Sequence, residues 1–253
     1  MSFILENVTR SIAVNGNRRT LFDALNIEIR AGERVGFLAP SKAGKTLLLK
    51  IMCGTERADE GRIHRGMRVS WPIGTSDFFS PSSSIAWNVR SIARFYGVTA
   101  PDFARRVAEI GGIAANLNTP LSACPPPGRQ LLAWSLGIAM DFDLYLFDNL
   151  AVPAKKEFKD QATAFLNEYT AGRAIFVASS VADTVATHCE STYVLEDGHA
   201  TFYEDVSEGV KRFKEVQKAE AERRKVMEEE VGQEVSEESD QSMEMLGAIV
   251  AAL

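Results

Sequence analysis

The sequence predicts an α/β protein whose mostly parallel sheet is covered by helices. Short apolar runs such as Arg34–Leu38 and Leu144–Phe147 are typical of buried strands. These runs alternate along the chain with segments of helical periodicity, which is the pattern of parallel strands joined by crossover helices. At 253 residues, the chain is long enough to bury a sizeable core as one such domain.

The first expected strands, Ser2–Asn7 and Ala24–Ile29, alternate apolar and polar residues, and Val14–Asn17 between them has turn chemistry. A hairpin with an Asp-Gly turn is expected near the end of the domain. The expected strands after the first two are Arg34–Leu38, Leu144–Phe147, Arg173–Ala178, Ser191–Leu195 and Ala200–Tyr203.

The expected helices have apolar residues on one stripe and recognisable ends. Gly54 stops the first helix, and Pro101 with Asp102 starts the third. The segment 115–127 reads as a loop that ends in three prolines. The expected helices are Lys45–Cys53, Ser84–Tyr96, Pro101–Ile110, Gly128–Met140, Lys155–Tyr169 and Val181–His188.

Composition excludes several classes of protein. Charged residues make up 25% and hydrophobic residues 45%, as in ordinary globular domains. The net charge of −6 gives no reason to expect nucleic acid or an acidic membrane surface as a partner. We expect no signal peptide and no membrane helix, since no apolar stretch approaches the roughly 20 residues that a membrane span needs. The three cysteines form no CxxC pair, which indicates reduced thiols.

A phosphate-binding loop is the most informative motif. It follows an expected strand and opens an expected helix, so that backbone N–H groups converge on phosphate at a helix N-terminus. Lys45 would bring charge to the β- and γ-phosphates, Thr46 a hydroxyl to Mg²⁺, and Gly44 close backbone approach. The candidate nucleotide-binding residues are Ala39, Ser41, Lys42, Ala43, Gly44, Lys45, Thr46 and Leu47.

The loop departs from the usual pattern at two positions. Ala39 stands at the first glycine, and a non-glycine residue at position 39 or 42 is strained wherever φ is positive. Lys42 has two interpretations, a phosphate contact or a solvated loop lysine. Asp148 strengthens the motif, because an apolar strand ending in a carboxylate can hold Mg²⁺ at its carboxyl end. Thr46 and Asp148 are therefore the candidate metal ligands.

These residues resemble the ATP-binding subunits of ABC transporters, over about residues 2–213. The resemblance is sharpest to the group that exports capsular and O-antigen polysaccharides. It implies an ABC nucleotide-binding fold of the P-loop NTPase type, with an antiparallel β subdomain and a helical subdomain at about 81–140. The stretches that carry it are Leu5–Arg10, Leu25–Ile29, Val69–Gly74, Arg90–Gly97, Met140–Asp148 and Val194–His199.

The resemblance also implies partners and a location. Such subunits bind ATP and Mg²⁺, pair head to tail, and dock beneath an integral-membrane ABC-2 permease, here through the surface around Trp71–Tyr96. The partner in the pair would be a second copy of this chain or an active paralogue. The chain would lie in the cytoplasm, peripheral at the inner face of the cell membrane.

Catalytic positions of the family are changed in this sequence. Asn149 stands where the family has the glutamate that polarises water, and Ser179 where it has the switch histidine. Ser80 aligns with the Q-loop glutamine, and Ile12 with the aromatic residue that stacks on adenine. Pro125, Pro126 and Pro127 replace the Ser-Gly-Gly signature, and proline has no N–H to donate.

Three functions remain open from the sequence. The first is a pseudo-ATPase subunit of a polysaccharide exporter, structural or regulatory rather than strongly hydrolytic. The second is a slow ATPase with a substitute base such as Asp77 or Asp141. The third is a scaffold outside transport that no longer binds nucleotide. Residues 214–253 form a charged tail, either a solvated helix or, at its apolar end Met243–Leu253, a short docking segment.

Overall fold

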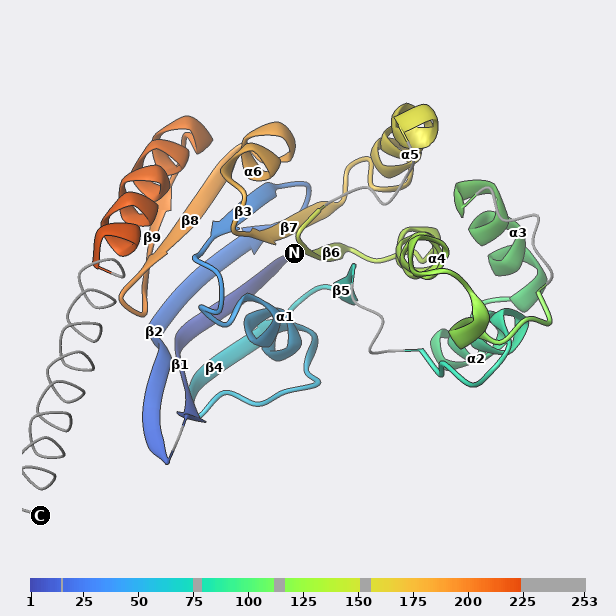
Figure 1. Cartoon of the computed structure of the whole chain (residues 1–253), viewed down its shortest axis with the longest axis horizontal. Coiled ribbons are helices and arrows are strands. Elements are labelled where there is room, and N and C mark those ends of the chain that lie inside the picture. The colour runs from blue at the N-terminus through green and yellow to red at the C-terminus, as the bar shows by residue number, and fades with distance from the viewer. Residues whose placement is uncertain (15, 75–78, 112–116, 151–155, 224–253) are drawn as a thin grey trace, which may run out of the picture. The chain divides into compact units, whose positions relative to one another are not determined.

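A computed structural model describes residues 1–14, 16–74, 79–111, 117–150 and 156–223. The chain divides into two compact units, Met1–Val210 and Lys211–Leu253. The sequence placed this boundary three residues later, after residue 213. A helix at 206–223 includes the described part of the second unit, and the remainder of the expected tail lies outside the described residues. The architecture below is that of the first unit (Figure 1).

A three-stranded antiparallel sheet forms one layer of the first unit, with strand order β2-β1-β4. Its strands are β1 (Ser2–Val14), β2 (Asn17–Arg30) and β4 (Glu60–Arg65). The strands β1 and β2 are longer than the sequence pattern indicates, because they continue as a solvent-exposed hairpin beyond the buried part of the sheet.

A six-stranded sheet forms the other layer, in the order β5-β6-β7-β3-β8-β9. All neighbouring pairs are parallel except β8 and β9, which form the expected hairpin. The strands are β3 (Arg34–Leu38), β5 (Val69–Ile73), β6 (Leu144–Asp148), β7 (Ala174–Ser179), β8 (Ser191–Glu196) and β9 (His199–Tyr203). The carboxyl ends of β3, β6 and β7 therefore meet at one edge.

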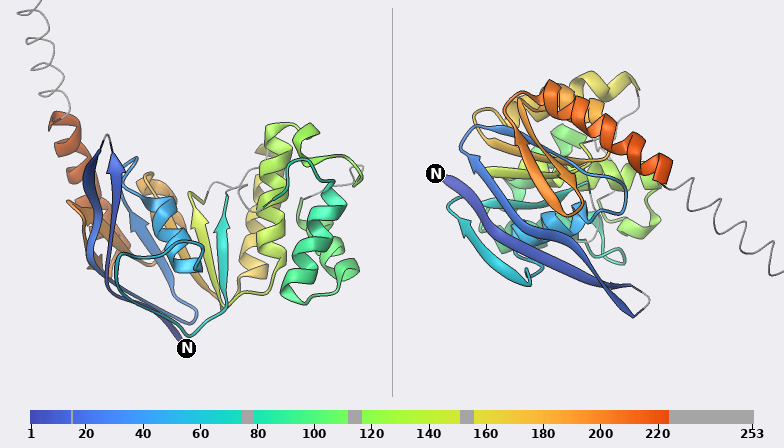
Figure 2. Two further views of the ribbon diagram at one scale, coloured as in Figure 1. Left: turned by 90° about the horizontal axis from the view of Figure 1, so that it is seen from below. Right: turned by 90° about the vertical axis from the view of Figure 1, so that its left-hand side faces the viewer.

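The helices connect the parallel strands, as the sequence predicts. Figures 1 and 2 show α1 beside the antiparallel sheet, and α2, α3 and α4 gathered beyond the β5 edge of the larger sheet. A short 3₁₀ turn, Leu121–Ala123, precedes α4. The helices are α1 (Lys45–Cys53), α2 (Ile85–Tyr96), α3 (Ala100–Gly111), α4 (Pro126–Ala139), α5 (Lys156–Tyr169) and α6 (Ala182–His188).

The main core lies between α1 and the two sheets. Phe22, Phe37 and Phe176 are fully buried in it, with Leu48 and Met52 of α1 packed among them. Gly137 of α4 lies very close to β5, because a Cβ atom at this glycine would be 2.6 Å from Cγ1 of Ile73. The helix α4 therefore packs directly on β5, the strand next to β6 and Asp148.

The sequence analysis missed two strands, β4 and β5. The edge strand β4 is exposed at five of its six residues, so it has little apolar alternation to recognise. The strand β5 contains Pro72, and proline within a run argues against a strand. Among the described residues, no helix is both long enough and apolar enough to cross a membrane.

Candidate functional site

The loop between β3 and α1 has the backbone of a phosphate-binding turn. Gly44 is the residue before α1 and has φ 88°, which a side chain would strain. A Cβ atom at Gly44 would also lie 2.9 Å from both Leu21 and Phe22. Lys42 has φ 66°, so this position does require the left-handed conformation that glycine adopts without cost. Ala39 is buried at the end of β3 and is not among the residues with positive φ.

Lys45 points into its own loop. Its Nζ donates hydrogen bonds to the carbonyl oxygens of Ala39 at 3.1 Å and Pro40 at 2.7 Å. Burial lowers the pKa of the Lys45 ammonium, and the Asp148 carboxylate acts in the opposite direction. A phosphate group reaching the loop would replace these carbonyl contacts with stronger charge-assisted ones.

Thr46 and Asp148, 102 residues apart, meet at the start of α1. The Thr46 hydroxyl donates to the Asp148 carboxylate. Mg²⁺ in phosphate sites takes one or two protein oxygens and completes its shell with phosphate and water. A hydroxyl and a carboxylate beside a phosphate loop fit that donor set. Within the described ranges, no cluster of three His, Cys, Asp or Glu residues offers a larger metal cage.

Asn149 and Ser179 lie together at the ends of neighbouring parallel strands. The Ser179 hydroxyl donates to Oδ1 of Asn149 at 2.9 Å and accepts from the Val181 N–H at 2.9 Å. Ser179 is fully buried, and Asn149 has φ 55°, a conformation that asparagine tolerates better than most residues. Neither side chain ionises near neutral pH, so the pair cannot accept a proton from water.

Other sequence candidates lie away from this pair. The Ser80 hydroxyl is bonded to that of Ser83 at 2.9 Å, and the Ser80 N–H to the Asn88 side chain. Asp141 is engaged by Arg173 at 2.6 Å, which leaves it poorly placed to act as a base. Asp77 lies outside the described residues.

The three prolines begin α4. Pro125 precedes the helix and Pro126 is its first residue, followed by Pro127. Proline is well suited to a first helical turn, where its missing N–H costs nothing. Because these residues lack N–H groups, this helix start cannot donate the hydrogen bonds that an anion would need at those positions.

A cavity of about 640 Å³ joins the loop to the strands β1, β2 and β6 and to the helix α4. Trp134 and Gln130 of α4 line it, four residues apart on one helix face, and the sequence analysis did not assign them. Leu21 of β2 was also missed, and Ile12, which the sequence aligned with the position that stacks on adenine, lines the cavity too. The remaining lining residues are Lys42, Gly44, Lys45, Thr46, Leu47, Gly74, Asp148 and Asn149.

Comparison with known proteins agrees with this geometry. The family profile described as "ABC transporter" matches residues 22–101. The chain carries an ABC transporter domain. This ABC domain is 29% identical to "ATP-binding protein BexA" of Haemophilus influenzae over 85% of the chain and 99% of that protein. It is 28% identical to "Capsule polysaccharide export ATP-binding protein CtrD" of Neisseria meningitidis, over 80% of the chain and 94% of that protein.

Solved structures agree on the fold of the ABC domain. A dimeric ATP-binding cassette in a post-hydrolysis state, bound to ADP and Pi, matches with a TM-score of 0.69 and 16% identity. The match covers 81% of this chain and 98% of that one. The ATP-binding subunit of another ABC transporter matches with a TM-score of 0.68 and 15% identity, over 79% of this chain and 88% of that one. The fold is therefore that of an ABC nucleotide-binding domain.

Proposed function

We propose that this chain is an ATP-binding subunit of an ABC transporter that exports polysaccharide, with a structural or regulatory role rather than a strongly hydrolytic one. The relatives named for capsule polysaccharide export support the transport class, since they match over most of their length. The observation that carries the regulatory assignment is the hydrogen bond between Ser179 and Asn149.

Nucleotide binding is supported by Lys45, Thr46 and Asp148, which have the contacts expected of a phosphate and magnesium site. Lys45 would hold the β- and γ-phosphates, and Thr46 with Asp148 would hold Mg²⁺. Bound Mg²⁺ would neutralise charge on the phosphate oxygens. The cavity beside these residues is within the usual size range of ligand pockets.

Weak hydrolysis is supported by the side chains at positions 149 and 179. A positioned acid–base group typically contributes about 10²- to 10⁴-fold in rate. An electrostatic contact to the transferring group contributes about 10²- to 10³-fold. Asn149 and Ser179 supply neither function, and the Ser179 hydroxyl donates its hydrogen bond to the Asn149 side-chain oxygen. The two losses belong to one site and do not simply multiply, but both act in the same direction.

A head-to-tail pair would not restore the missing groups. In such a pair, each site combines the loop of one subunit with the signature of the other. Here both halves are altered, the loop side at Asn149 and the signature side at Pro125–Pro127. No partner could therefore complete a full site with this chain, whether the partner is a second copy or an active paralogue.

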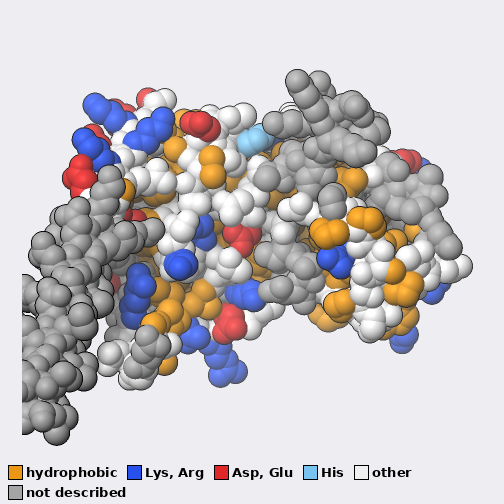
Figure 3. Space-filling view, viewed as in Figure 1, with side chains coloured by type: hydrophobic (Ala, Val, Ile, Leu, Met, Phe, Trp, Pro, Cys, Tyr) orange, Lys and Arg blue, Asp and Glu red, His pale blue; other side chains and the backbone are white. Residues whose placement is uncertain are grey.

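The proposed complex includes an integral-membrane permease, which places the chain at the cytoplasmic face of the membrane. A cavity of about 500 Å³ near α2 supports this, because Trp71, Trp87 and Phe95 line it. Phe95 is 82% exposed and Trp87 49%. Figure 3 shows other hydrophobic side chains on the surface of this helical part. Large exposed aromatic residues beside a cavity are typical of a protein contact surface.

Particular observations bear on the two other functions, one in favour of the scaffold and one against the slow ATPase. The self-contained contacts of Lys45 with Ala39 and Pro40 are compatible with a scaffold that no longer binds nucleotide. A slow ATPase would need a substitute base, and the ion pair of Asp141 with Arg173 weakens that candidate.

Isothermal titration of the purified chain with Mg-ATP tests the proposal, with Lys45→Ala as the control and steady-state turnover measured on the same samples. We expect micromolar binding that Lys45→Ala abolishes, and turnover far below 1 s⁻¹, about the lower end of typical enzyme rates. Turnover at or above that rate, lost in Lys45→Ala, would instead establish a genuine ATPase. Absence of binding up to millimolar Mg-ATP would establish the scaffold.

A further inference from the structure

The hairpin formed by β1 and β2 has two faces with different chemistry. In its register, Ser11 lies opposite Thr20 and Ile12 lies opposite Arg19. Residues directly opposite each other in an antiparallel pair share a face, with Cβ atoms about 5 Å apart. Ile12 and Arg19 are therefore neighbours on one face, and Ser11 and Thr20 are neighbours on the other.

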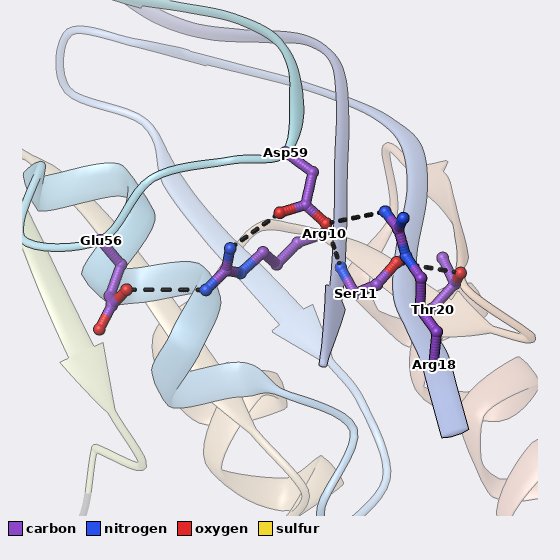
Figure 4. A network of polar contacts seen from close by, with 6 residues as sticks. All are labelled: Arg10, Ser11, Arg18, Thr20, Glu56 and Asp59. Carbon is purple, nitrogen blue, oxygen red and sulfur yellow. Dashed lines mark hydrogen bonds and ion pairs between the residues drawn. The ribbon is translucent and has the colours of Figure 1, made fainter. Parts of the chain in front are cut away.

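Asp59 lies beside Ser11, at the edge of β1 where β4 begins (Figure 4). The Asp59 carboxylate accepts from the Ser11 N–H at 2.8 Å, from Arg10 Nη1 at 2.8 Å and from Arg18 Nη2 at 3.4 Å. These bonds hold the pKa of Asp59 below its ordinary value. The guanidinium groups of Arg10 and Arg18 are thus both paired with the Asp59 carboxylate.

The face of Ile12 and Arg19 borders the nucleotide cavity. Ile12 and Leu21 line that cavity, and Leu21 also packs against the phosphate loop at Gly44. Arg19 lies directly opposite Ile12 in the register, so its side chain is on the same face of the hairpin as Ile12. Its side chain is exposed, and it makes no hydrogen bond or ion pair within the part of the chain that the structure describes.

Ile12 and Leu21 line the cavity on its hairpin side, and Asp148 lines it on the β6 side. Figures 1 and 2 show α1 between this hairpin and the strand β6, whose last residue is Asp148. A nucleotide with its phosphates at Lys45, Thr46 and Asp148 would place its base toward the hairpin. Ile12 offers that base an aliphatic side chain but no π face.

We propose that the Arg19 guanidinium stacks on the base of the bound nucleotide beside Ile12, a role that rests on the proposed nucleotide-binding function. The guanidinium group is planar and weakly hydrated, and it stacks on aromatic planes. A cation placed over an aromatic face contributes about threefold to thirtyfold in affinity, depending on its exposure. Arg19 is thus a binding residue for the base, and it supplies the flat surface that Ile12 lacks.

Calorimetric titration with two probes, Mg-ATP and inorganic tripolyphosphate with Mg²⁺, tests this role. The tripolyphosphate probe has the phosphates but no base. We expect Arg19→Ala to weaken Mg-ATP about threefold to thirtyfold and to leave tripolyphosphate binding unchanged. Arg18→Ala is the matched control, because it removes the neighbouring arginine on the other face, and we expect it to change neither affinity. Arg19→Lys keeps the charge without the plane, and we expect it to recover only part of the affinity.

Four results would overturn the assignment. Equal loss of Mg-ATP and tripolyphosphate binding in Arg19→Ala would make Arg19 a phosphate contact. Full recovery in Arg19→Lys would show that charge alone matters. Unchanged Mg-ATP binding in Arg19→Ala, while the unmodified chain binds ATP, would reject only this inference. Failure of the unmodified chain to bind either probe would reject the proposed function and this role together.

Discussion

The hydroxyl of Ser179, at the end of β7, donates a hydrogen bond to the side-chain oxygen of Asn149, just beyond β6. The same hydroxyl accepts the N–H of Val181, so one buried group links two strand ends and the start of the next segment. The pair therefore has a structural role that is separate from any catalytic role lost at these positions.

Replacing Ser179 by alanine should destabilise the protein. The change would remove the bonds of this hydroxyl to the Val181 N–H and the Asn149 oxygen, and a typical hydrogen bond contributes about 0.5–1.5 kcal/mol to stability. Urea denaturation would measure the loss. Ser191→Ala at the start of β8 is a control at a serine with no side-chain hydrogen bond among the described residues. Equal stability of the two variants would contradict the structural role.

Replacing Lys42 tests both the strain in the phosphate loop and the two interpretations of this lysine. Because φ is 66° at this position, Lys42→Gly should be about 1 kcal/mol more stable than Lys42→Ala. Since Lys42 is exposed, we expect both variants to bind Mg-ATP within about threefold of the unmodified chain, as for a solvated charge. A more than tenfold weakening in both would assign Lys42 to a phosphate instead.

Gly137 and Gly128 form a matched pair within α4. Alanine at Gly137 would place its Cβ 2.6 Å from Ile73, and overpacking of this kind costs about 1–3 kcal/mol. Alanine at Gly128 would meet nothing within 4 Å, so its higher helix propensity should stabilise the protein by about 0.5–1 kcal/mol. Thermal denaturation of both variants measures the difference. Similar melting temperatures would argue against the close packing of α4 on β5.

The thiol of Cys189 should be unreactive in the folded protein, because burial raises its pKa to about 12. Cys53 and Cys124 are only partly buried, so a thiol reagent at pH 8 should label two cysteines in the native protein and three after unfolding. Labelling of Cys189 in the native protein would contradict its burial.

The raised pKa of Cys189 also makes the stability of the folded protein depend on pH. Between an unfolded value of 9.0 and the folded value of about 12, the folded state holds the proton that the unfolded state has lost. This contribution to stability is complete below pH 9 and decreases by about 1.4 kcal/mol per pH unit above it. Cys189→Ala should show a shallower decline of stability over this range.

Most of the fold could be predicted from the sequence, because its buried strands and amphipathic helices have strong periodic patterns. The strand β3 and the helix α1 have the expected bounds, Arg34–Leu38 and Lys45–Cys53. The exposed edge strand β4 has no such pattern, since its partner β1 supplies backbone hydrogen bonds rather than burial.

The parts of the site that consist of residues close together in the sequence could be predicted. The loop from Ala39 to Thr46 is contiguous, and Asp148 ends an apolar strand, so both could be recognised. The contact of Ser179 with Asn149 depends on the pairing of β6 with β7, which no local pattern encodes. Trp134 lies in an expected helix, but only the packing of α4 on β5 places it at the cavity.

The aromatic surface of α2 should be needed for a permease but not for folding. Trp87 and Phe95 are exposed, so alanine at either should change the melting temperature little. We expect co-purification with the membrane permease to be reduced at least tenfold, since aromatic residues dominate such contacts. Phe202→Ala in β9 is the control, an aromatic residue elsewhere on the surface whose exposure is close to that of Trp87. Equal loss in the control would remove the assignment of this surface.

The proline start of α4 has a consequence for how long two such domains would stay together. A helix that begins with N–H groups can hold the anion of a neighbouring subunit, and the pair then separates when that anion is cleaved or leaves. Pro125 and Pro126 present ring carbons instead. At this contact, only the protein surfaces would determine the lifetime of a pair. That lifetime would not depend on the ratio of ATP to ADP.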